Sequence, residues 1–102
     1  MTTRQREWAA FRRDPYVRWV KSLRCAVCKA SGPSEPDHFP TVGSTGTVHT
    51  DVWPLCSVHH IERHHDVERF QQRYGIQIGP FIAALKTFFK EGVAQKRLKL
   101  VA

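Results

Sequence analysis

Three cysteines and one histidine form two short pairs whose spacing suits metal binding. Cys25-x2-Cys28 and Cys56-x2-His59 each place two side chains where they can bind one ion. Three thiolates and one imidazole are a common tetrahedral ligand set for zinc. Since four protein ligands leave no position for water, we predict a structural Zn2+ site. The odd count of three cysteines argues against a disulfide framework, and the alternative is three buried free thiols.

Further candidate ligands remain after the zinc site is assigned. His60 and His64 are spaced i, i+4, so on a helix they project from one face and can bind one ion together. They need a third ligand, and the adjacent Asp37 and His38 are the best donors upstream. Neighbours on an extended strand point to opposite faces, so one of the two can face the ion while the other faces elsewhere. The alternatives are a solvated helix face for the histidine pair and a surface turn for Asp37-His38.

The N-terminal part of the chain is predicted to be helical. We expect a short helix over residues 4–13. Asp14 followed by Pro15 is typical of a second helix start, because Asp caps free N–H groups and Pro fits the first helical position. Apolar residues spaced by three or four from Tyr16 to Leu23 predict one buried face for this second helix.

The middle of the chain is rich in Gly, Pro, Ser and Thr, which excludes a long helix there. Short strands are predicted around Glu35–Phe39 and Thr47–Trp53, joined by the loop "PTVGSTG". An irregular stretch of this length is uncommon in a small domain. A metal site that ties the ends of the loop together would explain it.

Two further helices are predicted in the C-terminal half. One begins at Ser57, acting as a cap, and ends at Gly75; the other opens at Gly79-Pro80 and ends at Gly92. The tail 93–102 is basic and is either a frayed end or an arm that contacts phosphate. Its cationic residues are Lys96, Arg97 and Lys99.

The length of 102 residues indicates a single domain over residues 1–102. With 16 Lys and Arg against 9 Asp and Glu, the formal charge is +7, which favours a polyanionic partner such as nucleic acid. The sequence shows no apolar signal core and no membrane-spanning run. We therefore expect a soluble cytoplasmic protein in a reducing compartment.

The order of these motifs resembles the HNH nuclease family, which has a ββα-metal fold. The similar pieces are the Cys-x2-Cys pair, "PDHF", a Gly-rich loop and "TDVWPLCSVHHIERHH", together covering roughly residues 14–74. The "PLC…HH…H" ending and the "DPYVRWVKSLRCAVC" lead-in are most similar to the small phage-associated branch linked to recombination. The resemblance implies an α+β fold, with a small zinc-containing ββα-metal core between N- and C-terminal helices.

The resemblance also implies roles for individual residues. His38 matches the first histidine of the motif, the general base that takes a proton from water. Asp37 matches a ligand of a catalytic divalent metal. His60 matches the final histidine of the motif, and His64 the further ligand one helical turn on.

The middle asparagine of the family motif has no match, and Asp51 lies nearest its position. In the family this residue orders the loop that carries the base. Aspartate can accept backbone N–H bonds for that purpose but cannot donate as asparagine can. His49 and His65 have no family counterpart and are expected at the surface or behind the ligands, with His65 a reserve ligand.

The function implied is a metal-dependent endonuclease that hydrolyses phosphodiester bonds in DNA, acting in phage recombination or DNA processing. It would work in the host cytosol, with a recombination protein as a possible partner. Two imidazoles and one carboxylate admit Mg2+, Mn2+, Zn2+ or Ni2+ as the catalytic ion. The main alternative is a non-catalytic zinc-containing module that binds nucleic acid. A third is a protein-interaction adaptor that uses the Phe-rich last helix.

Overall fold

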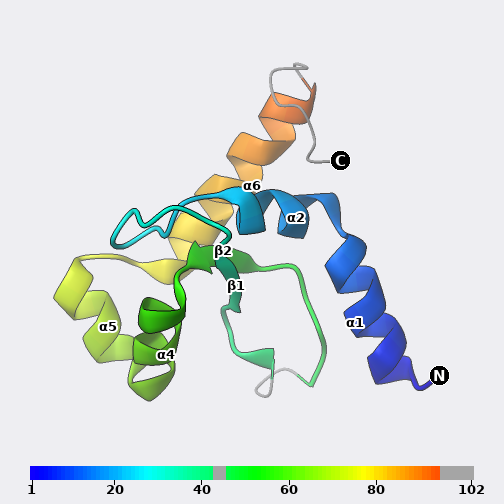
Figure 1. The fold of residues 1–102 in the computed structure, drawn as a ribbon, viewed down its shortest axis with the longest axis horizontal. Helices are drawn as coiled ribbons and strands as arrows, with labels where there is room; N and C mark the ends of the chain where they lie inside the picture. Colours follow the sequence, from blue (N-terminus) through cyan, green and yellow to red (C-terminus); the bar gives the residue numbers. More distant parts are fainter. Residues whose placement is uncertain (43–45, 95–102) are drawn as a thin grey trace.

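Helices flank a short two-stranded sheet in this chain (Figure 1). The computed structural model describes residues 1–42 and 46–94. Its helices and strands are α1 (Thr3–Arg13), α2 (Pro15–Ser22), β1 (Glu35–His38), β2 (Val52–Leu55), α4 (Ser57–His65), α5 (Val67–Tyr74) and α6 (Ile78–Ala94). The predicted α+β class is therefore confirmed.

The start of α2 agrees with its prediction from Asp14 and Pro15. The Asp14 carboxylate accepts a hydrogen bond from the Val17 N–H at 3.1 Å, and Pro15 occupies the first turn. The buried face carries Tyr16, Val17, Trp19 and Val20. This apolar face packs α2 onto the sheet.

The two strands pair in antiparallel register, with Asp37 opposite Trp53 and His38 opposite Val52. The predicted second strand is present, but its bounds were wrong, because β2 covers Val52–Leu55 and not Thr47–Trp53. Residues before it make local polar contacts in place of strand pairing. The Asp51 N–H, for example, donates to His49 Nδ1 at 3.2 Å.

The helix predicted from Ser57 to Gly75 is two helices, α4 and α5. Asp66 breaks it with extended backbone angles, φ −163° and ψ 100°, and its carboxylate caps α5 by accepting the Arg69 N–H at 3.1 Å. Asp is a favoured cap, so a second helix start competes here with helix continuation. Ser57 is also not a cap, because it is the first helical residue and Cys56 precedes the helix. Gly75 ends α5 in the left-handed conformation, as predicted.

The last helix, α6, begins at Ile78 and continues beyond Gly92 to Ala94, so the predicted stop at Gly92 was wrong. Gly92 is buried within the helix. A helical glycine costs only about 1 kcal/mol relative to alanine, which tertiary packing can offset. Most of the predicted basic tail, including Lys96, Arg97 and Lys99, lies outside the described residues. Within the described part of the chain, none of the helices has both the length and the apolar character needed to span a bilayer.

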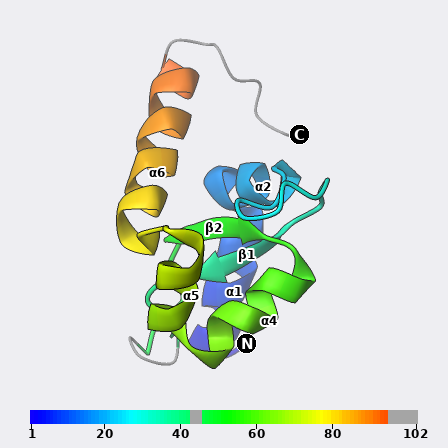
Figure 2. The ribbon, with the colours of Figure 1, turned by 90° about the vertical axis from the view of Figure 1, so that its left-hand side faces the viewer.

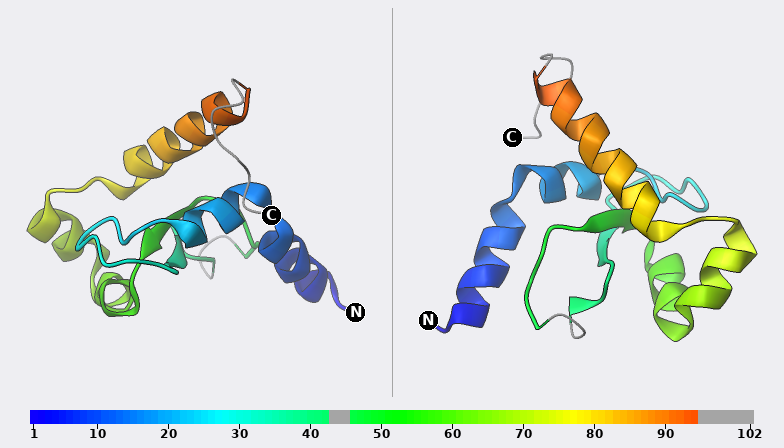
Figure 3. Two further views of the ribbon diagram at one scale, coloured as in Figure 1. Left: turned by 45° about the horizontal axis from the view of Figure 1, so that its top comes forward. Right: turned by 180° about the vertical axis from the view of Figure 1, so that it is seen from behind.

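Strand β2 lies between two groups of buried side chains. Val52 belongs to the group built from α1 and α2, whereas Trp53 and Leu55 belong to a group completed by α5 and α6. Helix α1 lies on one side of the sheet, with α4 and α5 on the other (Figure 3). In Figure 2, α4 and α5 face the viewer and α1 lies behind the strands. Side chains from α1, β1 and α4 can therefore meet around one end of the sheet.

Candidate functional site

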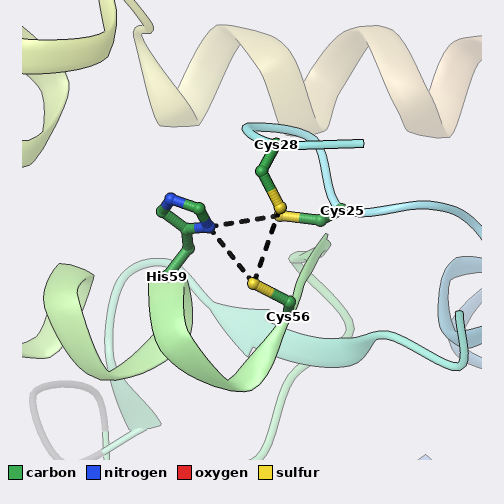
Figure 4. A group of neighbouring side chains, drawn as sticks. All are labelled: Cys25, Cys28, Cys56 and His59. Carbon is green, nitrogen blue, oxygen red and sulfur yellow. Dashed lines mark hydrogen bonds between the residues drawn. The ribbon is translucent and has the colours of Figure 1, made fainter. Parts of the chain in front are cut away.

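The structure brings together the four residues predicted to bind zinc (Figure 4). Their ligand atoms all lie within 4.8 Å of one another. Cys28 Sγ is 3.8 Å from Cys56 Sγ, Cys25 Sγ is 3.7 Å from His59 Nδ1, and Cys56 Sγ is 3.1 Å from His59 Nδ1. Around one tetrahedral zinc ion, two sulfur ligands lie about 3.8 Å apart and a sulfur and a nitrogen about 3.5 Å. These residues can therefore hold a metal ion such as zinc.

Backbone hydrogen bonds hold the first cysteine pair beside the sheet. The Cys25 N–H donates to the Ala30 carbonyl at 3.1 Å, and the Ala26 N–H donates to the Pro54 carbonyl of β2 at 2.9 Å. Burial raises the pKa of Cys25, but backbone hydrogen bonds at Cys28, Cys56 and Val27 outweigh it and lower the pKa to about 6. A thiol of low pKa is ready to bind a cation as thiolate.

Asp37, His60 and His64 form a second group that could hold an ion. The Asp37 Oδ1 lies 3.1 Å from His60 Nε2 and 3.5 Å from His64 Nε2. Neighbouring oxygen and nitrogen ligands about 2.1 Å from one ion lie about 3.0 Å apart in an octahedron and 3.4 Å in a tetrahedron. Asp37 is fully buried, whereas the His64 side chain is 48% exposed, so the group opens toward solvent on the His64 side.

Glu35 orients His60 within this group, a role that the sequence did not reveal. The His60 Nδ1–H donates to Glu35 Oε1 at 2.6 Å, which leaves Nε2 pointing at the Asp37 carboxylate. A carboxylate behind a histidine ligand is the usual way to set its ring orientation and tautomer. The pKa of His60 is raised, first by its hydrogen bond with Asp37 and then by Glu35, against the effect of burial.

Arg63 is a second residue that sequence reasoning missed. It is 4% exposed and forms an ion pair with Asp37 through Nη2 and a hydrogen bond from Nε to Asp37 Oδ2 at 2.8 Å. Its Nη2 also donates to the His38 carbonyl at 3.1 Å and to His64 Nε2 at 3.3 Å. Arg63 lies three residues after His60 on α4. This helical spacing was the signal in the sequence that Arg63 shares a helix face with the candidate ligands.

The Asp37 carboxylate remains ionised despite its burial. Burial raises its pKa, but hydrogen bonds from His60 and Arg63, the Arg63 charge and a hydrogen bond from Trp53 lower it by more. The Trp53 Nε1–H donates to Asp37 Oδ2 at 2.8 Å. A fixed, charged carboxylate suits a cation ligand, and the same contacts also suit a structural ion pair.

The His38 ring is partly buried and packs against aromatic side chains of α1. It stacks on Phe11 at 4.8 Å between ring centroids and meets the edges of Trp8 and His49 at 5.8 and 5.0 Å. Burial, followed by the neighbouring His49, lowers its pKa, so the ring is neutral at pH 7. Its Nε2 is buried and has no hydrogen-bond partner. Leaving a buried acceptor in this state costs about 1–3 kcal/mol.

A cavity of about 270 Å³ joins these groups, lined by His38, His60 and His64 together with side chains of α1. The candidate base and two of the three candidate ligands therefore share one cavity. A larger cavity of about 500 Å³ beside Gly75 has none of these residues in its lining. Of these two cavities, the smaller one is lined by the candidate base and ligands.

Asp51 does not contact the His38 ring directly. Its carboxylate accepts from Lys86 Nζ of α6 at 2.5 Å, and its carbonyl accepts the Phe39 N–H at 3.1 Å. Its N–H donates to His49, whose Nε2–H donates to the Pro40 carbonyl at 2.7 Å. Asp51 therefore connects to the His38 ring through His49, and to the neighbouring Phe39 through its carbonyl.

His65 is exposed on α4 and belongs to neither ligand group. Its predicted place at the surface agrees with the structure, and the reserve-ligand role finds no support in its position. His49 lies behind the candidate base, against the His38 ring.

The chain matches the family model described as "Protein of unknown function (DUF968)" over residues 3–92. It is also 35% identical, over 79 residues, to the uncharacterized protein YdfU of Escherichia coli (strain K12). That alignment covers 74% of this chain and 22% of YdfU, so the chain spans about a fifth of the length of this relative. No solved structure matches the chain. Because the family model covers most of the sequence, the chain belongs to the DUF968 family.

Proposed function

We propose that this protein is a metal-dependent endonuclease of the HNH type that hydrolyses phosphodiester bonds in DNA. One observation carries the proposal. The neutral His38, with its unpaired Nε2, lines the same cavity as the ligand pair His60 and His64. A base and a three-ligand cation site at one cavity are the parts that phosphodiester hydrolysis requires.

Each residue has a chemical task in this proposal. Asp37, His60 and His64 would hold one divalent ion, with Mg2+, Mn2+, Zn2+ and Ni2+ all compatible with the donor set. When bound, such an ion supplies positive charge that stabilises the negative charge of the transition state. His38 accepts a proton from the attacking water at Nε2, a contribution of typically ~10²–10⁴-fold. Arg63 holds the Asp37 carboxylate in place through contacts with both of its oxygens.

The other cluster would hold a structural Zn2+ through Cys25, Cys28, Cys56 and His59. This zinc would connect the segment after α2 to the first turn of α4, which also carries His60. The proposed ββα-metal core consists of β1, β2 and α4, and it rests on the sequence resemblance together with this ligand arrangement.

DNA is proposed as the substrate from the charge of +7 and from the exposed arginines of α1. A place in phage recombination, a recombination-protein partner and a cytosolic location rest on the resemblance alone.

One observation favours the alternative of a zinc-containing module that binds nucleic acid without cleaving it. Asp37 is already paired with Arg63 and Trp53, so this buried carboxylate is satisfied without an ion. Metal stoichiometry separates the two functions. One tight zinc per chain supports the binding module, and a second, exchangeable divalent site supports the nuclease.

The direct test incubates the purified protein with plasmid, single-stranded DNA and RNA, with and without divalent ions. We expect DNA cleavage only with the ion. His38→Ala should lose cleavage and retain zinc and fold, whereas His64→Ala should regain part of the rate at excess divalent ion because it lacks only a ligand. His65→Ala is the matched control, an exposed histidine of the same helix outside both ligand groups, and should cleave normally. Cleavage by His38→Ala at the wild-type rate would refute the assignment of the base.

A further inference from the structure

One wall of the cavity is aromatic and comes from α1. Trp8 and Phe11 line the cavity together with Pro36 of β1 and with His60 and His64 of α4. Trp8 is partly exposed, unlike the other two tryptophans, Trp19 and Trp53, which are 8% and 0% exposed. The indole therefore faces the cavity in addition to covering the core.

The size and chemistry of this wall suit a flat apolar group. The cavity volume of about 270 Å³ is slightly below the range of roughly 300–1,000 Å³ that is typical of pockets for drug-sized ligands. A phosphate or sugar would be served by several polar donors, but Trp8, Phe11 and Pro36 offer mainly apolar surface, with the indole N–H of Trp8 as their one side-chain donor. A nucleobase, by contrast, has an apolar face that stacks on aromatic side chains.

Cations lie on the same helix. The residues Arg4, Arg6, Arg12 and Arg13 are all exposed on α1, which has Glu7 as its one acidic residue. An aromatic surface beside cationic groups that follow the backbone is the usual arrangement for single-stranded nucleic acid. Helix α1 combines both features next to the candidate ion and base.

We propose that this wall, Trp8 above all, stacks an unpaired nucleobase beside the scissile phosphate, so that the substrate is DNA with single-stranded character. The inference rests on the proposed nuclease function. A base inside a duplex has both faces covered by its neighbours, and extracting it costs a few kcal/mol. A base in a single strand or at a branch reaches the indole without most of that cost.

The test measures binding of labelled oligonucleotides to the otherwise wild-type protein by anisotropy, without added divalent ions so that nothing is cut. We expect single-stranded DNA to bind more tightly than duplex of the same sequence. Trp8→Ala should weaken single-strand binding about 5- to 150-fold, the loss expected for one stacked base. Trp8→Phe should restore most of that loss because it keeps an aromatic face.

Two controls separate stacking from misfolding. Phe88→Ala removes an aromatic side chain that is 57% exposed and lies on α6, outside the cavity, and should leave binding unchanged. Zinc content and melting temperature are measured for each variant. If Trp8→Ala melts early, the Trp8→Phe protein and an oligonucleotide with one abasic site replace it. A single abasic position should weaken wild-type binding by a similar factor.

The failure of this inference differs from the failure of the nuclease proposal. If the folded Trp8→Ala protein binds single strand and duplex equally well, and with the affinity of the wild type, the stacking role is overturned. This holds even if the wild type cleaves DNA. Trp8-dependent binding with no cleavage under any ion would retain the stacking role and reject the nuclease. Tighter Trp8-dependent binding to RNA than to DNA of the same sequence would overturn the assignment to DNA.

Discussion

At the scale of single residues, Glu35 and Arg63 decide how the candidate ligands are presented. Glu35 fixes the ring of His60, and Arg63 fixes the carboxylate of Asp37. The Glu35 hydrogen bond leaves His60 Nε2 directed at the Asp37 carboxylate, and Arg63 contacts both oxygens of that carboxylate. The site is therefore arranged before any ion binds, which lowers the cost of binding one.

We expect Glu35→Gln to weaken binding of Mn2+ at the second site about 10- to 100-fold, because the amide no longer sets the tautomer of His60. Calorimetric titration of the zinc-loaded protein measures this affinity. Glu62→Gln is the matched control, since Glu62 accepts from Tyr74 and Arg73 and touches no candidate ligand. Unchanged Mn2+ affinity in Glu35→Gln would mean that the Glu35–His60 hydrogen bond does not orient a ligand.

From the lowered pKa of His38 we predict how the rate of cleavage changes at acid pH. Burial and the neighbouring His49 lower this pKa below its ordinary value of 6.5, so the base stays neutral until the pH falls further. A protonated ring cannot accept the proton of water. At saturating divalent ion we therefore expect the rate to fall only below pH 6.5. An acid limb above that value, unaffected by more ion, would contradict the assignment of His38.

At the scale of helices and strands, α2 is tied to β2 by one buried hydroxyl. The Tyr16 hydroxyl donates to the Val52 carbonyl at 2.8 Å, immediately beside the pairing of Val52 with His38. Burial, followed by the charges of Asp51 and Asp14, raises the pKa of Tyr16 well above its ordinary value of 10. The position of β2, and of the β1 strand that pairs with it and carries His38, thus depends on a group that must stay protonated.

This contact predicts a loss of stability at alkaline pH. Above about pH 10 the unfolded chain loses the tyrosine proton while the folded chain keeps it, so the free energy of unfolding falls as the pH rises. Urea unfolding at neutral and alkaline pH should show a smaller fall in Tyr16→Phe than in the wild type. At neutral pH the variant should be about 1–3 kcal/mol less stable, because the Val52 carbonyl loses its partner. An equal alkaline fall in both proteins would show that Tyr16 is not its source.

At the scale of the whole molecule, the cysteine and histidine cluster brings together the segment after α2 and the start of α4. The segment from Leu23 to Ser34 has neither helix nor strand, and Cys25 nevertheless lies in a buried apolar group with Trp53 and Leu55. A metal ion at this cluster would join that segment to α4. Its binding free energy would then be part of the folding free energy.

We therefore expect Cys25→Ser to lose bound zinc and to lower the melting temperature strongly. Zinc content by elemental analysis and melting by circular dichroism measure the two effects. The variant should also lose Mn2+ binding, because His60 follows directly on the ligand His59. Retention of zinc with an unchanged melting temperature would exclude the four-ligand site.

The charge of +7 predicts that DNA binding weakens steeply with salt, since each phosphate neutralised releases condensed counterions. For a single strand, the slope of the logarithm of the binding constant against the logarithm of the salt concentration should be about −0.7 per phosphate contact. Arg12→Gln on α1 should reduce the slope by roughly one such contact. Lys90→Gln, at an exposed position of α6, is the control and should leave it unchanged. An affinity that does not depend on salt would point to a protein partner.

The sequence by itself determined the features that depend on local spacing. The pairs Cys25-x2-Cys28 and Cys56-x2-His59 identified one ligand cluster, and the i, i+4 pair His60 and His64 identified part of another. Local rules also gave the start of α2 at Asp14 and the end of α5 at Gly75. Each of these pairs and helix ends depends on residues a few positions apart, so the pattern of residue types is enough to find it.

Only the tertiary structure decided what surrounds these ligands. Glu35 reaches His60 because β1 runs beside α4, and the register of Asp37 opposite Trp53 brings the indole N–H to the carboxylate. Trp8 comes 30 positions before His38 in the chain, yet the packing of α1 brings the two rings into contact at the cavity. These contacts join residues that are distant in sequence, and they depend on strand register and helix packing that no local pattern encodes.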